Sequence, residues 1–74
     1  MKYYEATNGF MGYSYVRCNV YANDEEEALE LAREAFKSTD DARIIGEGYY
    51  RNIELELLLD TDADKEPFYT YVTD

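Results

Sequence analysis

The spacing of apolar side chains changes at Asn23 from every second residue to every third or fourth. Before this point, residues 13–22 alternate between small or β-branched side chains and mostly tyrosines, which predicts a half-buried strand. After it, the apolar residues of 24–37 fall on one arc of a helix. Asn23 can cap that helix, with Glu26 three residues later as the acid of a capping box. A strand that runs directly into an amphipathic helix is therefore the strongest constraint on the fold.

Shorter apolar runs flank this unit and are expected to complete a sheet. An Asn8-Gly9 turn signal joins a first strand to the strand at 13–22 as a hairpin. The expected strands outside the unit are residues 2–7, 42–45, 49–59 and 68–72, the last of them at an edge. The order is then ββαββ(β), an α+β fold in which an antiparallel sheet carries one helix on one face. The length of the chain predicts a single domain, residues 1–74.

The same patterns assign side chains to the core. On the second strand, the residues expected to face the helix are Ser14, Val16, Cys18, Val20 and Ala22. On the helix, the expected core face is Ala28, Leu29, Leu31, Ala32, Ala35 and Phe36. On the long strand, the expected core face is Ile53, Leu55, Leu57 and Leu59, with Glu54 and Glu56 on the other side. Gly46-Glu47-Gly48 predicts a bulge or tight turn before that strand.

The charge of the chain restricts its partners. Seventeen acidic residues against seven basic ones give a formal net charge of −10. Such a field repels nucleic acid and anionic membranes and favours a basic protein. A second interpretation is that the acidity serves only solubility. The single cysteine and the lack of a signal-peptide pattern predict a cytoplasmic protein, which is the host cytoplasm if a phage encodes the chain.

Catalytic and metal-binding patterns are weak. The sequence has no histidine, and Cys18 falls on the predicted core face, so we expect no enzyme and no cofactor. Residues 60–64 begin like a calcium-binding loop, with aspartates at alternate positions. Lys65 and Tyr71 replace the glycine and the glutamate that such a loop needs later. A solvated loop is the expectation, and weak calcium binding stays open.

Acidic rows and tyrosines are the candidate binding residues. Three glutamates recur once per turn on the predicted helix, and two more alternate along the long strand. Tyrosine supplies rigid contact area at protein interfaces, and here it lines the sheet face opposite the core, where Tyr3 and Glu5 of the first strand are also expected. The predicted partner contacts are Glu26, Glu30, Glu34, Glu54, Glu56, Tyr13 and Tyr15. A homodimer that buries the two tyrosine-rich faces together is another interpretation of the same pattern.

Two resemblances follow from these features. In size, charge and acidic segments (residues 24–34 and 54–66) the chain resembles the small phage proteins that block host defence, such as anti-CRISPR inhibitors and other DNA mimics. That resemblance implies a basic, nucleic-acid-binding host protein as the target. The strand-to-helix stretch at 20–29 is similar to one in HicB-type antitoxins, whose further glycine, proline and cysteine signals are missing here. The leading hypothesis is a non-enzymatic inhibitor, and the alternative is a structural or regulatory subunit whose acidity is incidental.

Overall fold

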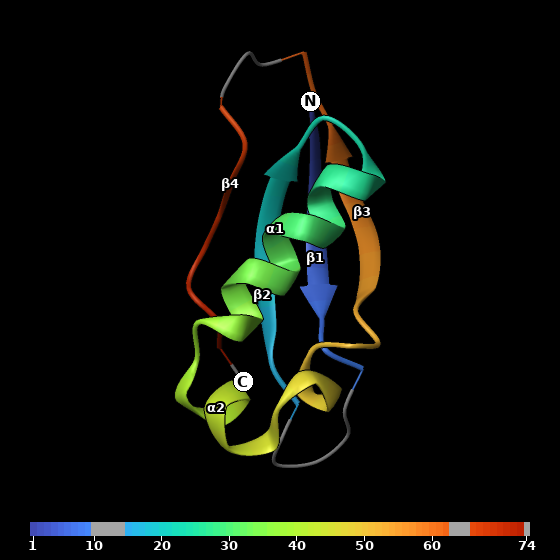
Figure 1. The fold of residues 1–74 in the computed structure, drawn as a ribbon. Coiled ribbons are helices and arrows are strands. Elements are labelled where there is room, and N and C mark those ends of the chain that lie inside the picture. The colour runs from blue at the N-terminus through green and yellow to red at the C-terminus, as the bar shows by residue number, and fades with distance from the viewer. Residues whose placement is uncertain (10–14, 63–65, 74) are drawn as a thin grey trace.

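The fold has two layers, a sheet and a helical layer on one of its faces (Figure 1). The computed structural model describes residues 1–9, 15–62 and 66–73. Along the chain the elements are β1 (Lys2–Thr7), β2 (Arg17–Ala22), α1 (Glu25–Lys37), α2 (Asp40–Ile45), the 3-10 helix η2 (Glu47–Tyr49), β3 (Glu54–Asp60) and β4 (Phe68–Tyr69). The predicted α+β fold, an antiparallel sheet with a helix packed on one face, is confirmed.

The strand order in the sheet is β3-β1-β2-β4, and all neighbours are antiparallel. β1 is therefore central, with Tyr3 opposite Tyr21 of β2 on one side and opposite Leu59 of β3 on the other. The predicted pairing of the first two strands is confirmed. β3 and β4 form the two edges of the sheet.

Side-chain hydrogen bonds hold the first turn of helix α1. The Asp24 carboxylate accepts from the backbone N–H of Glu27 at 2.8 Å. The Glu27 carboxylate in turn accepts from the backbone and side-chain N–H groups of Asn23, at 2.8 and 3.0 Å. The prediction of Asn23 as the cap with Glu26 as its partner is wrong by one residue. The cap is Asp24, and Glu27 accepts from Asn23, the residue before the cap, whereas Glu26 is exposed.

Small residues bring α1 close to the sheet. Its buried residues are Ala28, Ala32, Ala35 and Phe36. α1 lies mainly over β2, whose predicted core residues Cys18, Val20 and Ala22 are buried, as is Val16 just before the strand. The predicted core residues Leu29 and Leu31 are only half-buried. Burying Phe36 in full contributes about 1.5–3 kcal/mol.

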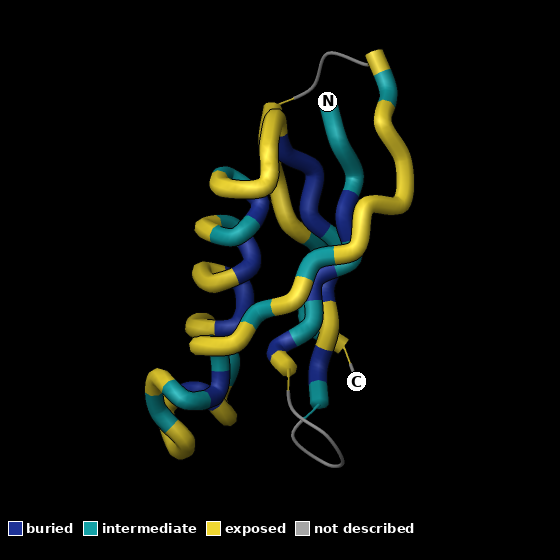
Figure 2. The backbone as a smooth tube through the Cα atoms, turned by 90° about the vertical axis from the view of Figure 1, so that its right-hand side faces the viewer, coloured by how far each residue is buried: buried dark blue, intermediate teal, exposed yellow. Residues whose placement is uncertain are grey.

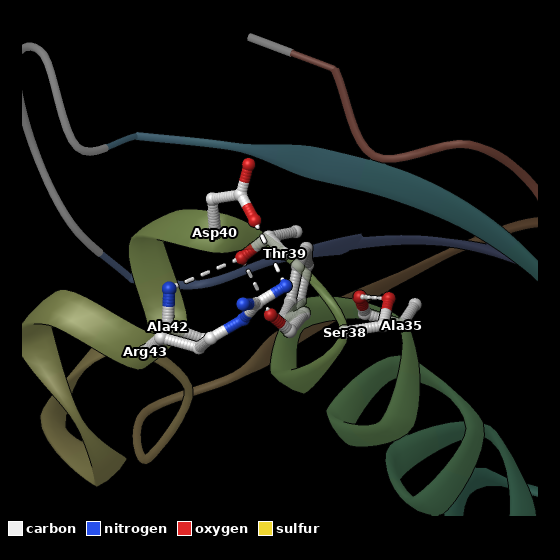
Figure 3. Close-up of polar contacts among 7 residues, drawn as sticks. Ala35, Ser38, Thr39, Asp40, Ala42 and Arg43 are labelled. Atoms are coloured by element: carbon white, nitrogen blue, oxygen red, sulfur yellow. Dashed lines mark hydrogen bonds and ion pairs between the residues drawn. The ribbon is translucent and has the colours of Figure 1, made fainter.

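Residues 40–45 form a helix, so the predicted strand at 42–45 is wrong. The Thr39 hydroxyl accepts from the N–H of Ala42 at 3.2 Å and donates to the carbonyl of Phe36 at 2.8 Å, which links the end of α1 to the start of α2 (Figure 3). Asp40 and Asp41 place negative charge in the first turn. Ile44, which suggested a strand, is 82% exposed. Cap chemistry here outweighs the β-propensity of two isoleucines.

The predicted strand at 49–59 begins later than expected. Gly46 ends α2 with a φ of 88°, and Tyr49 donates its N–H to the Gly46 carbonyl at 3.0 Å in a tight turn. Tyr49 is fully buried under this turn as part of η2. The strand therefore starts only at Glu54. A tight turn at the two glycines was one of the two expected forms.

A bulge in β3 changes which face of the sheet its alternate side chains point to. Leu57 lies opposite Tyr4 and Leu59 opposite Tyr3, so Leu58 is the extra residue between them. Directly opposed residues point to the same face of a sheet. Leu55 and Leu57 therefore lie on the side of α1, whereas Leu59 lies on the other side with Tyr3. The prediction that Leu59 faces the core is wrong for this reason.

Two predicted strands are shorter in the structure. β2 begins at Arg17, and Tyr13 and Ser14 lie outside the described residues. β4 spans only Phe68–Tyr69, and an isolated bridge between Arg17 and Thr73 continues the contact with β2. The predicted edge position of the last strand is confirmed.

Candidate functional site

The outer face of the sheet, turned away from α1, carries a row of apolar side chains that crosses all four strands. The register places its members side by side in the order Leu59, Tyr3, Tyr21, Phe68. The rings of Tyr3 and Tyr21 have centroids 5.7 Å apart, and those of Tyr21 and Phe68 are stacked at 5.5 Å with an angle of 7°. Tyr21 is buried in the middle, while Leu59 is 56% exposed at the β3 edge. We call these four residues the apolar row.

Acidic residues occupy the same face beside the apolar row. Glu56 of β3 lies directly opposite Glu5 of β1, and Glu54 lies opposite Thr7 on the next outward-facing rung. Together with Tyr15, the three glutamates line a depression of ≈ 290 Å³. We call Glu5, Glu54, Glu56 and Tyr15 the acidic depression. Like charges directly opposite each other destabilise a sheet, so this arrangement carries a cost in folding stability.

One cation lies next to the acidic depression. The Arg17 guanidinium is 4.0 Å from the Glu5 carboxylate, and both side chains are partly exposed. A pair of this kind contributes about 0–1 kcal/mol, because water screens it. Arg17 and Glu5 also line a second depression of ≈ 480 Å³ with Asn19 and Thr70. The outer face is thus a shallow surface, acidic towards β3 and mixed in charge towards β4.

The predicted acidic rows lie on opposite sides of the molecule. Glu26, Glu30 and Glu34 are exposed residues of α1. The exposed parts of this helix lie on its side away from the sheet (Figure 2). Arg33 and Lys37 share this face, because they lie three or four residues from those glutamates along the helix. Glu54 and Glu56, by contrast, belong to the outer face of the sheet. The two rows therefore cannot contact one flat partner together.

Of the predicted tyrosines, Tyr15 lies in the acidic depression and Tyr13 falls outside the described residues. Glu5 is a member of the acidic depression that the predicted contacts did not include. Alternation in the first strand did place Glu5 on the outer face. The missing information was the register, which sets Glu5 opposite Glu56.

A third hollow is apolar and lies between the end of α1 and residues 68–72. It has a volume of ≈ 740 Å³ and is lined by Ala35, Ser38, Thr39 and residues 68–72. Tyr71, one of these lining residues, is 93% exposed. Nothing in the sequence predicted this groove, since it forms between two segments that are far apart along the chain.

Burial makes three titratable groups of the core harder to ionise. Burial raises the pKa of the Cys18 thiol to about 11, so the thiolate is scarce at neutral pH. Burial also raises the pKa of the phenols of Tyr4 and Tyr49. Within residues 1–9, 15–62 and 66–73, no three acidic or sulfur side chains are grouped so that they could hold a metal ion. The loop at 60–64, for which weak calcium binding stays open, includes residues outside the described part of the chain.

Comparisons of the chain with protein-family models, curated proteins and solved structures found no match. In the part of the chain that the structure describes, each helix is too short or too polar to cross a lipid bilayer.

Proposed function

We propose that this protein is a non-enzymatic binding module that uses the outer face of its sheet to hold a basic protein surface. The partner class is a nucleic-acid-binding protein of a host defence system, and the chain acts as its inhibitor in the cytoplasm. The observation that carries the proposal is the acidic depression, in which three carboxylates surround a hollow beside the apolar row. The formal net charge of −10 supports it, because the whole field attracts a basic partner.

The chemistry of the outer face suits arginine and lysine side chains. Carboxylates on neighbouring strands can accept hydrogen bonds from a guanidinium or an ammonium, and such bonds are stronger than neutral ones. The aliphatic stems of these side chains can pack on Leu59 and Tyr3 next to the depression. Tyrosine and phenylalanine also dominate the energy of many interfaces. The face thus offers charge recognition and apolar contact together.

The spacing of the acids supports competition with nucleic acid. Glu54 and Glu56 are two residues apart on β3, which separates them by roughly 6.5–7 Å. This is comparable to the separation of phosphates along one DNA strand. A basic channel that grips phosphates can therefore accept these carboxylates instead. Glu5 broadens the acidic edge across to β1.

The helix face is the weaker candidate for the same role. Its three glutamates follow one turn after another, but Arg33 and Lys37 stand among them. The local field on α1 is therefore partly neutralised, and no apolar row adjoins it among the described residues. We assign the contact to Glu5, Glu54, Glu56 and Tyr15 for this reason.

The test is capture from a bacterial lysate with the immobilised chain, with and without an excess of duplex DNA. We expect it to retain nucleic-acid-binding proteins, and we expect DNA to displace them. Retention should also fall steeply as salt rises from 50 to 300 mM, because the contact is driven by charge. Retention that neither DNA nor salt reduces would contradict the proposal.

A regulatory or structural subunit is the second candidate, and the apolar row favours it. Leu59 and Phe68 leave apolar area exposed on the outer face, so two copies could bury it together as a homodimer. Such a contact would bring Glu5, Glu54 and Glu56 of each copy towards those of the other. Sedimentation equilibrium at low and high salt separates the two ideas. Dimerisation that becomes tighter as salt rises supports the subunit. A monomer at both low and high salt supports the inhibitor.

A further inference from the structure

The strand β3 is the long edge of the sheet. It spans seven residues, Glu54–Asp60, and pairs only with β1 among the described elements. The other edge, β4, has two residues. Figure 2 is turned towards the β3 side, and most of β3 is coloured as exposed there. On an edge strand, the backbone N–H and C=O groups that point away from the neighbouring strand, in the plane of the sheet, are free to pair with another extended chain.

The side chains of this edge alternate in chemistry up to the bulge. Glu54 and Glu56 lie on the outer face, and Leu55 and Leu57 lie on the face of α1. Leu57 is 51% exposed, because α1 lies mainly over β2 and leaves β3 partly uncovered. A strand added next to β3 would stand about 4.8 Å away, close enough for each of its side chains to meet one of these four.

Charge complementarity defines the partner strand. Its residues beside the two glutamates must be cationic, and those beside the two leucines must be apolar. From the geometry we infer that β3 binds an extended segment of a basic partner, in which lysine or arginine alternates with aliphatic residues, as a fifth strand of the sheet. This deepens the proposed function and rests on it: it names the form of the basic segment that the acidic depression meets.

A second copy of the chain fits this edge poorly. Antiparallel pairing of two β3 strands along the regular part Glu54–Leu57, centred on Leu55, would set Glu54 of each copy against Glu56 of the other. Two pairs of like charges would then oppose each other across the new ladder, and each pair is destabilising. Acidic residues on an exposed edge are a known means of preventing such self-association. A cationic strand removes the same repulsion.

The bulge at Leu58 limits the length of the pairing. Bulges bend a strand and increase its twist, so a regular ladder can run along Glu54–Leu57 and is interrupted beyond it. The exposed Leu58 and Leu59 then form an apolar end to the site. The partner segment is accordingly short. It has two cations beside the glutamates, apolar residues beside Leu55 and Leu57, and one further aliphatic residue at the apolar end.

The test uses two fluorescent nine-residue peptides of the same composition, five lysines and four valines. In the first the residues alternate, and in the second the lysines form one block. We expect the alternating peptide to bind at least tenfold more tightly, because only it can place cations and valines on the correct faces. Hydrogen exchange should slow at the amides of residues 54–58 when it binds, and should stay unchanged at Phe68 and Tyr69 of β4.

Equal affinity of the two peptides, no binding of the alternating peptide, or binding without slower exchange in β3 would overturn the inference. The proposed function is judged separately, by the capture of basic proteins and its competition by DNA, and can hold when the edge does not pair. A third peptide, alternating glutamate with valine, controls for a general affinity of the edge for strands. We expect this acidic peptide not to bind.

Discussion

Gly9 and Gly46 are the residues with positive φ in the described chain, at 76° and 88°. A side chain at Gly9 would also place its Cβ 2.4 Å from the backbone oxygen of Asn52, whereas the space around Gly46 and Gly48 is open. These three positions therefore separate two costs that an alanine can bring. One is backbone strain, and the other is a collision with a neighbouring segment.

We predict a graded effect of replacing each of them by alanine. Gly48→Ala should leave the free energy of unfolding within about 0.5 kcal/mol of the wild type. Gly46→Ala should lower it by about 1–3 kcal/mol through strain alone. Gly9→Ala should cost more than Gly46→Ala, since Asn52 must also move. Urea unfolding followed by circular dichroism measures all three, and a neutral Gly9→Ala would refute the close packing of this turn.

The opposed pair Glu5 and Glu56 predicts a conflict between stability and binding. Removing one charge of a like pair relieves a repulsion of roughly 0.2–1 kcal/mol. Glu56→Gln should therefore raise the free energy of unfolding and at the same time weaken retention of basic proteins. Glu47→Gln removes the same charge from an exposed position beside Arg51 and is the matched control. If Glu47→Gln stabilises the chain as much as Glu56→Gln, the gain reflects only net charge.

At the scale of elements, α1 depends on its first turn. Asp24→Ala removes the bond to the N–H of Glu27 and should cost about 1 kcal/mol, which lowers the melting temperature by about 4–8 °C in a domain of this size. Asn23→Ala keeps the backbone N–H that donates to the Glu27 carboxylate, so it should lower the stability of the fold by less. Thermal unfolding compares the two variants. A larger loss for Asn23→Ala would mean that Asn23 is the cap.

Local patterns predicted the elements that local chemistry determines. β1 and α1 follow from alternation and helical spacing: β1 has the expected bounds, and α1 begins one residue later than expected. The helix α2 was missed because Ile44 and Ile45 suggested a strand, although Thr39 and Asp40 already carried the signal of a helix start. The same stretch shows how a cap can outweigh two β-branched residues when their side chains face solvent.

The candidate site could be predicted only in part, because it depends on contacts between distant segments. Alternation placed Glu54, Glu56 and Glu5 on one face, but the β1–β3 register alone makes Glu5 the neighbour of Glu56. The bulge at Leu58 has no local signature such as glycine or proline. It moves Leu59 to the outer face and so completes the apolar row, which no spacing argument anticipated.

At the scale of the whole molecule, the net charge of −10 acts on the fold itself. Repulsion among exposed carboxylates destabilises the compact state and is screened over about 10 Å at 0.1 M salt. We predict that the melting temperature rises by several degrees between 10 and 300 mM NaCl, a gain of about 1 kcal/mol. A helix-face variant carries Glu26→Gln, Glu30→Gln and Glu34→Gln. With three charges fewer, the melting temperature of this variant should rise less with salt. A wild-type melting temperature that does not change with salt would show that self-repulsion is negligible.

In the proposed complex the outer face of the sheet, and not α1, meets the basic partner. A sheet-face variant carries Glu5→Gln, Glu54→Gln and Glu56→Gln, and has the same formal net charge of −7 as the helix-face variant, because each loses three negative charges from −10. The measurement is the amount of DNA-displaceable protein that each immobilised variant retains from a bacterial lysate, after circular dichroism has shown that both are folded. We predict at least a tenfold loss for the sheet-face variant and less than a twofold change for the helix-face variant. Equal losses, or a larger loss for the helix-face variant, would contradict the account.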